Sequence, residues 1–525
     1  MRGVTTVGER PADLDDLRDR ALDILCGAAL SAMVEMVVFS PGPDLYEARA
    51  VDGATRFRRH LDGPDWRYQL IKVEGRDPLG DQDPARFSPL AAEVADRQPD
   101  RRRNSYPLAY ERIAQVFDHP CAPDLCVLHT AAHRPGTHRG EHGSLDVVQS
   151  RAPFVASGAG VRPLGLVPGH CRLIDFAPTV LALLGLEPGP GVGPSGDVVD
   201  GMLLSRQDGT PLTALIDPDA AAAEQVVVVL MDGANANVLY EAAAEGLAPN
   251  VGRLIERGTA LAQGAVASLP TVTLANHTSL NTGAHPGHHG VLHNAWYDRA
   301  RGHQVVTESP ATWQEAMRWL FPGVETIHEA LHRHRPDAVS VAVNEPADRG
   351  ADYSTFDLFR RNEVARLAEG LPKALPHADP KWLAASEDYR WGSRVDASAV
   401  HQLRRIWEGE FLGTRYPLPT FTWVSLSLTD AAFHQGGPHS AIARAAVADS
   451  DARLGEVLEA IETRGALDTT AVVVVADHGM EENAVDNLGD WCDALRAAGI
   501  VHRDEASGFI YLGVGPDEPA VPATA

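Results

Sequence analysis

Three aspartates of this chain directly follow runs of apolar residues, and two of them are accompanied by a histidine. Asp232 follows VVVVLM, and Asp477 follows AVVVVA and precedes His478. Asp430 ends the run FTWVSLSLTD, and His434 lies four residues further on, so both side chains share one face if a helical turn begins there. Carboxylate and imidazole are ligands that suit a zinc-like ion. A strand-end aspartate can also simply cap the next helix, but three such ends together predict a divalent metal site.

The segment SLPTVTLANHTSLNTGAHPGHHGVLHN, residues 268–294, contains a candidate nucleophile. Thr273 lies where a helix is expected to begin, and the backbone N–H groups at such a position favour an anion. A threonine hydroxyl needs a base or a metal ion before it can attack, and the local sequence alone favours the simpler role of a helix N-cap. We expect the histidines of this segment to form hydrogen bonds in loops rather than to bind metal: His277, His285, His288, His289 and His293.

The elements that must position these residues are short apolar runs separated by helical stretches such as residues 444–465. Continuous apolar strands of this kind predict an α/β fold with a mostly parallel central sheet and helices on both faces. In such a sheet, ligands gather at the carboxyl ends of the strands, which is where the three aspartates lie. The runs are residues 124–130, 152–160, 224–233, 338–346, 421–430 and 470–479.

The composition limits the partners. The chain has 525 residues, with 71 acidic and 46 basic residues and a formal net charge of −25. This charge argues against a nucleic-acid polymer, but not against a small phosphate ester, because bound cations can reverse the local charge. No run reaches the roughly 18 apolar residues of a membrane span and none resembles a signal peptide, so we expect no membrane partner. The five cysteines are sparse and odd in number, which favours a reduced, cytoplasmic protein.

Four motifs together carry a resemblance to a known family: VLMDG, TVTLANHTSLNTGAHPGHHGVLHN, LTDAAFHQGGPHS and VADHGM. They resemble the alkaline phosphatase superfamily, and within it the nucleotide pyrophosphatase/phosphodiesterase branch, whose relatives include phosphonoacetate hydrolase. The resemblance implies an alkaline phosphatase-like fold, two zinc ions, for which manganese or iron could substitute, and a threonine nucleophile at Thr273. It also implies an asparagine 21 residues after the nucleophile, and 294 − 273 = 21 gives Asn294.

The resemblance implies two sets of metal ligands. One ion would be held by Asp232, Thr273, Asp477 and His478. The other would be held by Asp430, His434 and a histidine from the family's C-terminal part. No residue after His478 fits that third position, because His502 lacks the following glycine, whereas GEHGSLDV at residues 140–147 supplies His142 in the expected context. Three other histidines could compete with His142: His129, His133 and His138.

The order of the segments is unusual for this family. GEHGSLDVVQSRAPFVASGAGVRPLG and CRLIDFAPTVLALLGL resemble the family's C-terminal end, yet they precede the part that resembles its N-terminal portion. We therefore expect a circular permutant, in which residues 1–216 correspond to the family's C-terminal part, 217–224 form a linker and 225–525 correspond to its N-terminal part, all within one catalytic domain. The order could also arise from a fusion of two half-length proteins, or from a separate N-terminal domain with an accidental match.

The substrate is less clearly indicated. Nucleotide-cleaving relatives carry a base-stacking aromatic directly after the nucleophile and another five residues before the aspartate of the Asp/His pair; here these positions are Leu274 and Ser425. Asn294, Leu274 and His439, the last in GGPHS, are expected to contact the substrate, and Asn294 in place of a cation favours a diester. The expected function is a metal-dependent phosphodiesterase acting through a phospho-threonine at a di-zinc site. Two competing functions are a phosphonate or phosphomonoester hydrolase on the same scaffold and a non-catalytic, metal-stabilised binding protein.

Overall fold

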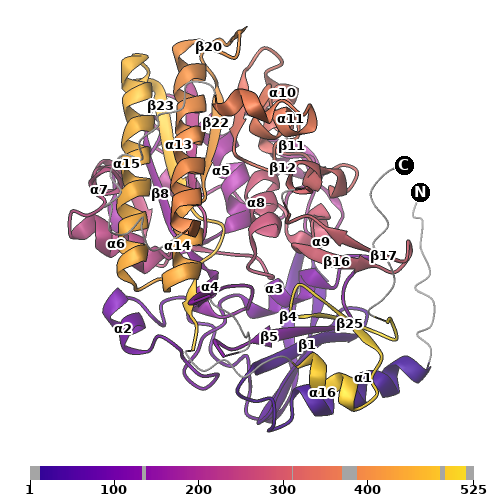
Figure 1. Ribbon diagram of the computed structural model, residues 1–525. Helices are drawn as coiled ribbons and strands as arrows, with labels where there is room; N and C mark the ends of the chain where they lie inside the picture. The colour runs from indigo at the N-terminus through magenta and orange to yellow at the C-terminus, as the bar shows by residue number, and fades with distance from the viewer. Residues whose placement is uncertain (1–11, 133–137, 310, 369–386, 485–490, 516–525) are drawn as a thin grey trace.

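The computed structural model describes residues 12–132, 138–309, 311–368, 387–484 and 491–515, and its strands form two large sheets (Figure 1). The central sheet has eight strands, and five of its seven neighbouring pairs are parallel. The α/β fold with a mostly parallel central sheet is thereby confirmed. In spatial order the strands are β19 (Tyr353–Ser354), β18 (Ser340–Val343), β22 (Phe421–Leu426), β13 (Gln225–Met231), β23 (Thr470–Val475), β8 (Phe154–Gly158), β14 (Gly258–Leu261) and β9 (Gly165–Val167).

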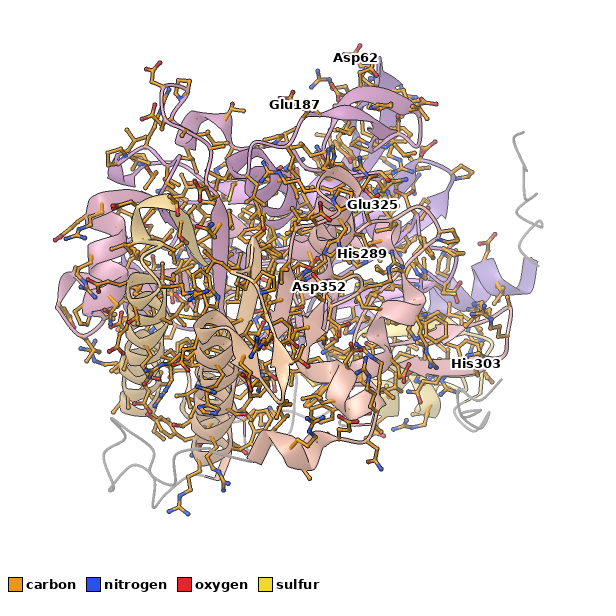
Figure 2. All side chains as sticks on the ribbon, turned by 90° about the horizontal axis from the view of Figure 1, so that it is seen from above. Asp62, Glu187, His289, His303, Glu325 and Asp352 are labelled. Carbon is orange, nitrogen blue, oxygen red and sulfur yellow. The ribbon has the colours of Figure 1, made fainter. Side chains whose placement is uncertain are left out.

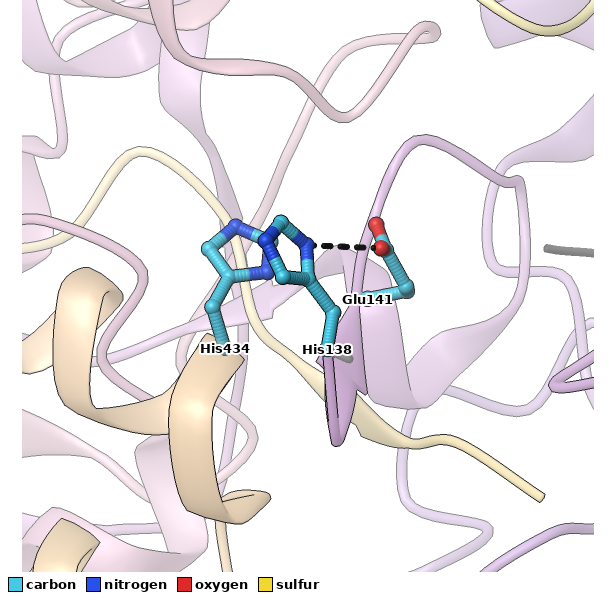
Figure 3. Close-up of side chains that lie close together, drawn as sticks. All are labelled: His138, Glu141 and His434. Atoms are coloured by element: carbon cyan, nitrogen blue, oxygen red, sulfur yellow. Dashed lines mark hydrogen bonds and ion pairs between the residues drawn. The ribbon is translucent and has the colours of Figure 1, made fainter. Parts of the chain in front are cut away.

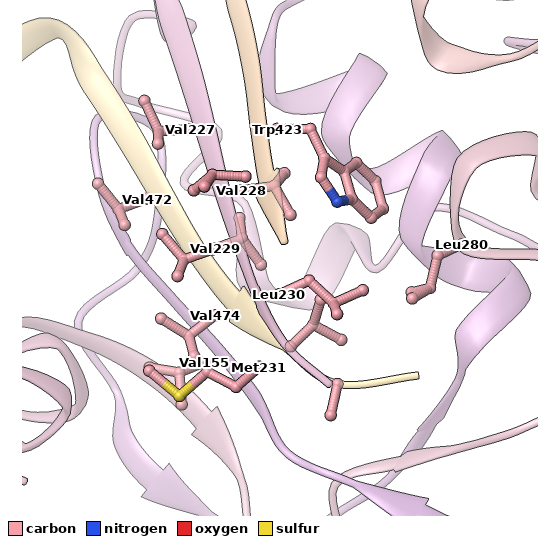
Figure 4. Close-up of a cluster of buried hydrophobic side chains, with 14 of the residues drawn as sticks. Val155, Val227, Val228, Val229, Leu230, Met231, Leu280, Trp423, Val472 and Val474 are labelled. Atoms are coloured by element: carbon pink, nitrogen blue, oxygen red, sulfur yellow. The ribbon is translucent and has the colours of Figure 1, made fainter. Parts of the chain in front are cut away.

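The apolar composition of the central strands follows from their position inside the molecule. Every residue of β13 is buried, and this strand pairs in parallel with β22 on one side and β23 on the other, so that Val228 lies opposite Trp423 and Val473. A strand that is covered on both faces needs apolar side chains at consecutive positions, which explains the run of four valines. These side chains and their neighbours from β23 and β8 form the main core (Figure 4).

Helices cover both faces of this sheet. Successive residues of a strand point to opposite faces. Thr422 accepts a hydrogen bond from the indole of Trp407 on α13 (Glu387–Glu408), whereas the next residue, Trp423, stacks edge-on against Phe176 of α5 (Phe176–Leu183). The helix α13 therefore lies on one face with α14 (Leu428–Gly436) and α15 (Ala441–Thr463), and α5 lies on the other with α8 (Thr273–Thr282) and α10 (Ile327–His334).

The second sheet was not expected from the sequence. All of its described pairings are antiparallel, and it combines strands from the two ends of the chain, since β26 pairs with β5. The apolar run at 124–130 belongs to this sheet as β5, which corrects its assignment to the parallel sheet; a run of this length fits either kind of buried strand. The strands in order are β25 (His502–Glu505), β26 (Phe509–Leu512), β5 (Leu125–His129), β1 (Val34–Gly42), β2 (Leu45–Ala50), β3 (Gly53–Asp62) and β4 (Asp65–Gly75).

The part of the chain before residue 217 contributes directly to the central sheet. Its strand β8 pairs with β23, and the short strand β6 (Gly140–Glu141) pairs with β24 (Glu481–Glu482), which follows β23. Residues 217–224 form an irregular and largely exposed connection into β13. None of the helices in the described ranges has both the length and the apolarity that crossing a bilayer requires.

Candidate metal centre

The carboxyl ends of β13, β22 and β23 are joined by hydrogen bonds that place the aspartates together. The backbone N–H of Asp232 donates to the Leu426 carbonyl oxygen at 2.9 Å, and the N–H of Gly233 donates to Asp477 Oδ1 at 3.0 Å. Gly233 has φ +63°, and a Cβ atom on it would lie 2.7 Å from Asp430 Oδ1. Only glycine therefore lets the chain turn away here without displacing the third aspartate.

An inner group of donor atoms consists of Asp232, Asp477 and His478. The Nε2 atom of His478 lies 3.1 Å from Asp477 Oδ2 and 3.9 Å from Asp232 Oδ1. All three of these atoms are buried, and none has a hydrogen-bond partner among the described residues. A buried polar atom without a partner is costly, so three that face one another indicate a candidate cation site. The ligand atoms lie within 4.8 Å of one another, which suits a single divalent cation.

An outer group contains His142, Asp430 and His434. His142 Nε2 lies 3.9 Å from Asp430 Oδ1 and 3.2 Å from His434 Nε2, and His434 Nε2 lies 3.4 Å from Asp430 Oδ1. His142 Nδ1 is 2.8 Å from the Thr271 carbonyl oxygen, and His434 Nδ1 is 2.8 Å from that of Gly140. A carbonyl only accepts, so both rings carry the proton on Nδ1, and their Nε2 lone pairs face each other. This geometry requires a cation or a proton between them.

The charges of the two groups act on one another. Burial, together with the charges of Asp477 and Asp430, raises the pKa of Asp232 well above its usual range. Burial and the neighbouring rings of His478 and His434 lower the pKa of His142 well below its usual range. The two groups share one buried space, since the rings of His142 and His478 stack with centroids 3.7 Å apart. The ionised form of Asp232 and the neutral form of His142 are the forms that bind a metal, so a bound cation would stabilise both.

Thr273 is the first residue of α8, the helix whose first turn faces the inner group. One turn later on the same helix face, His277 places its Nε2 atom 3.7 Å from Asp232 Oδ2 and 3.7 Å from Asp477 Oδ2. Two residues before Thr273, the Thr271 carbonyl contacts His142. The threonine therefore lies between a contact to the outer group and a contact to the inner group. Its role as nucleophile and ligand remains a prediction.

His277 is a site residue that the sequence analysis assigned to a loop. It lies on α8, only 2% exposed, and its Nδ1 atom is 2.8 Å from Oε2 of the fully buried Glu345. Burial alone would lower the pKa of His277, but the charge of Glu345 and the nearby carboxylate of Asp232 raise it well above its usual range. The four-residue spacing from Thr273 was the available signal. No sequence pattern indicated Glu345 as a site residue, because it follows a strand that lies far along the chain from His277.

Asn294 lies beside the first turn of α8. Its Oδ1 atom accepts a hydrogen bond from the Leu274 backbone N–H at 3.3 Å, and its amide nitrogen donates to Glu308. The side chain of Leu274 is only 1% exposed and packs in an apolar cluster with residues of the second sheet. The expected contact between the Leu274 side chain and substrate is therefore wrong; only its backbone faces this region. The reason is that the second sheet, absent from the expectation, supplies an apolar surface under α8.

His439 also differs from the expectation that it contacts the substrate. Its side chain is 3% exposed, with Nε2 3.4 Å from Oε1 of Glu93, and burial together with Arg97 lowers its pKa to about 4. Other histidines are likewise interior: His289 is fully buried within the body of the molecule, whereas Asp62 and Glu187 are exposed at its periphery (Figure 2).

A further pair of donors lies outside the outer group. His138 Nδ1 is 3.1 Å from Oε1 of Glu141, and the His138 ring lies beside that of His434, with centroids 4.8 Å apart (Figure 3). His434 has one lone pair, on Nε2, which already faces Asp430 and His142. His138 and Glu141 therefore lie beside His434 and do not form a separate metal centre with it.

Two more histidines were expected to compete with His142 for the second cation. His129 points its Nδ1 atom at the Thr130 carbonyl oxygen at 3.3 Å, and His133 lies outside the described residues. Since His142 contacts both Asp430 and His434, it is the histidine that completes the outer group.

The fold and the two donor groups define an α/β protein with a candidate two-cation centre at one edge of its central sheet. The family model of type I phosphodiesterases/nucleotide pyrophosphatases matches residues 226–523, more than half of the chain. The chain therefore belongs to this family, whose members hydrolyse phosphate esters.

Individual relatives match parts of the chain. An uncharacterized pyrophosphatase/phosphodiesterase of Schizosaccharomyces pombe is 25% identical over 287 residues, 53% of this chain and 49% of the relative. Ectonucleotide pyrophosphatase/phosphodiesterase family member 3 of Mus musculus is 24% identical over 268 residues, 50% of this chain and 26% of the relative. The chain thus spans about half the length of the first relative and about a quarter of the second.

Solved structures align with it more loosely. Murine ectonucleotide pyrophosphatase/phosphodiesterase 5, in an inactive form in complex with AMP, aligns with a TM-score of 0.38 and 15% identity over 55% of this chain and 66% of that chain. Wild-type alkaline phosphatase PafA aligns with a TM-score of 0.34 and 16% identity over 49% of this chain and 63% of that chain.

Proposed function

We propose that this protein is a metal-dependent phosphodiesterase that acts through a phospho-threonine at a di-zinc site. The supporting observation is the convergence of unpartnered buried donor atoms from the inner and outer groups at the start of α8. One cation would be held by Asp232, Thr273, Asp477 and His478, and the other by Asp430, His434 and His142. Imidazole and carboxylate donors favour zinc, with manganese or iron as possible substitutes.

Two divalent cations in this centre would supply Lewis acidity, which lowers the pKa of a hydroxyl or water and stabilises negative charge on oxygen. The Thr273 hydroxyl loses its proton, and Oγ attacks phosphorus in line with the leaving alkoxide or aryloxide. A phosphorus–Oγ bond forms as the bond to the leaving oxygen breaks. Water then cleaves the phospho-threonine, returns the hydroxyl to Thr273 and releases a monoester. The Asn294 amide would donate to a non-bridging oxygen, which gains charge in the transition state.

The structure offers no base-stacking side chain at either family position. Leu274 is turned into the core, and Ser425 is 3% exposed and hydrogen-bonded to Trp423 and Glu345. Discrimination would therefore depend on the phosphate rather than on a nucleobase. A phosphonate or phosphomonoester hydrolase is the second candidate, favoured only by the shared donor set. A metal-stabilised binding protein would explain the donors but not a threonine hydroxyl at the helix start.

We also propose that the chain is a circular permutant of the family. The family match begins at residue 226, yet β8 of the central sheet and His142 of the outer group both come from the part before it. A variant that joins residues 225–525 to 1–216 would restore the family's order. We expect it to fold and to bind the same number of cations, because the cut lies in the irregular and largely exposed connection of residues 217–224. The five cysteines form no disulfide within the described residues, which supports a reducing, cytoplasmic setting.

One experiment tests the proposed function. The zinc-loaded protein is assayed with a bis-aryl phosphate, an aryl phosphate and an aryl phosphonate, beside Thr273→Ala and Thr273→Ser. We expect preference for the diester, a loss of roughly a thousandfold or more in Thr273→Ala, and partial recovery in Thr273→Ser. Equal turnover by Thr273→Ala would remove the threonine from the mechanism. Preference for the phosphonate or the monoester would support the second candidate, and no turnover despite bound zinc would support a binding protein.

A further inference from the structure

Glu308 is held against Asn294 by both its backbone and its side chain. The hairpin of β16 (Ala295–Asp298) and β17 (His303–Val306) pairs Ala295 with Val306, so the residues that flank the two strands meet. The backbone N–H groups of Thr307 and Glu308 both donate to the Asn294 carbonyl oxygen, at 2.9 and 3.2 Å. The Glu308 carboxylate in turn accepts a hydrogen bond from the Asn294 amide nitrogen. The hairpin therefore delivers a carboxylate to this amide.

The orientation of the Asn294 amide follows from its two neighbours. Leu274 can only donate its backbone N–H, so it faces Oδ1, and the carboxylate of Glu308 accepts from Nδ2. One N–H of Nδ2 is thus directed to Glu308, and the other remains for a phosphoryl oxygen. Glu308 therefore adjoins the space where a phosphate would lie.

We propose that Glu308 determines which charge state of a phosphate ester this site accepts. It disfavours the second negative charge of a monoester dianion and leaves phosphodiester monoanions as the substrate class. This inference rests on the proposed function and deepens it, since Asn294 alone is neutral and would distinguish the two esters only weakly. It also assigns a consequence to the product: the released monoester is a dianion, so the same carboxylate favours its departure.

The expected size of the effect is set by screening. Glu308 is exposed, so water and salt weaken its interaction with a phosphate a few ångströms away. A unit charge at that range in a partly solvated site is worth about five- to tenfold in binding. The effect must shrink at high ionic strength, which a purely steric role for Glu308 would not do.

The test compares Glu308→Gln with the control Glu462→Gln. Glutamine keeps an acceptor oxygen for Asn294 and removes only the charge, and Glu462 is a matched exposed glutamate in the last turn of the 23-residue helix α15. Two quantities are measured at low and high salt: the ratio of kcat/KM for a bis-aryl phosphate to that for an aryl phosphate, and the affinity of zinc-loaded protein for inorganic phosphate by calorimetry. In Glu308→Gln we expect the ratio to fall about five- to tenfold and inorganic phosphate to bind more tightly, both less so at high salt.

An unchanged ratio and an unchanged phosphate affinity in Glu308→Gln would overturn the inference, as would equal changes in Glu462→Gln. A uniform loss on both esters would also overturn it, because it would show that Glu308 acts by positioning Asn294 rather than through charge. Failure of the proposed function gives results that differ from failure of this inference. If the wild type hydrolyses neither ester, or if Thr273→Ala is fully active, the proposed function is wrong. The phosphate-binding measurement still tests the role of Glu308 in that case.

Discussion

Two buried clusters of charged side chains take histidines from the same segment, yet they are completed in different ways. The first is the candidate metal centre, which consists of the inner and outer groups with His277 beside them; it is called the metal centre below. The second, here called the α9 cluster, surrounds α9 (Pro286–His289) and comprises Glu111, Asp118, Arg172, Asp208, His285 and His288. In the α9 cluster His288 contacts Asp208 through Nδ1 at 2.6 Å and Asp118 through Nε2 at 2.9 Å. In the metal centre, the Nε2 atoms of His277 and His478 have no hydrogen-bond partner.

This difference in hydrogen-bond partners distinguishes a structural network from a candidate ion-binding site. In the α9 cluster each carboxylate meets a cationic side chain; burial would raise the pKa of Glu111, but His285 and Arg172 lower it to about 2. In the metal centre, carboxylate faces carboxylate, and the pKa of Asp232 moves the opposite way. Buried charge is stable only when it is balanced, so the α9 cluster is complete within the chain, whereas the candidate metal centre would be balanced by bound cations.

The largest expected effect is that of removing the cations. Stripping the protein with a chelator should abolish hydrolysis and lower the free energy of unfolding by about 4 kcal/mol for each cation site, relative to protein at a cation concentration a thousandfold above the dissociation constant of that site. Chemical denaturation with and without chelator measures this, and metal analysis should return two cations per chain. Equal stability of the two forms would contradict the view that the donor atoms are incomplete without cations.

In the α9 cluster, the largest expected change in the free energy of unfolding comes from substituting a single side chain, that of Asp208. Asp208 accepts from the His288 ring and from the His285 backbone N–H, and it pairs with Arg206. Asp208→Asn would leave these donors without a balancing charge and should lower the free energy of unfolding by about 3 kcal/mol, with or without cations. The exposed Asp200→Asn serves as the control and should change it by less than about 0.5 kcal/mol. Stability of Asp208→Asn equal to that of the control would show that the network contributes little.

The sequence predicts the metal centre better than it predicts the α9 cluster. Asp232 and Asp477 each follow a continuous apolar run, and such a run is typical of a buried parallel strand. His142 was assignable only through a resemblance, and its contact with His434 joins positions 292 residues apart. Nothing in the local sequence of Asp208 indicates that it meets His288, because this contact depends on how separate segments pack.

The second sheet was missed for a related physical reason. Much of β4 is exposed, so its side chains carry no continuous apolar signal, and β25 and β26 reach the sheet from the opposite end of the chain. The consequence for the site is local: Leu274 was expected to face substrate, but this sheet offers its side chain an apolar surface to pack on. Sequence patterns predict which residues are buried, whereas only the structure shows which residues they pack against.

A smaller effect concerns the pH dependence of stability in the α9 cluster. Burial alone would lower the pKa of His288, but Asp208 and Asp118 raise it to about 8. A histidine with a raised pKa contributes stability that is complete below its unfolded value of about 6.5 and is lost as the pH rises through 8. The cation-free protein should therefore lose about 2 kcal/mol from this residue between pH 6 and 9. His288→Gln should flatten that decline, and the half-exposed His303→Gln should not; equal slopes in both variants would assign the decline elsewhere.

The smallest effect is the most discriminating, because its sign is opposite in the two clusters. Asp232 lies beside Asp477 and Asp430, and burial with their charges raises its pKa, so the cation-free protein loses stability here as the pH rises. Asp232→Asn removes that repulsion. In the cation-free state, the variant should therefore be about 1 kcal/mol more stable than the wild type at pH 8. The same variant should lose most of the stabilisation that cations give, as denaturation with added zinc would measure. If Asp232→Asn instead destabilised the cation-free protein as Asp208→Asn does, the metal centre would be a network complete in itself, and the distinction between the two clusters would fail.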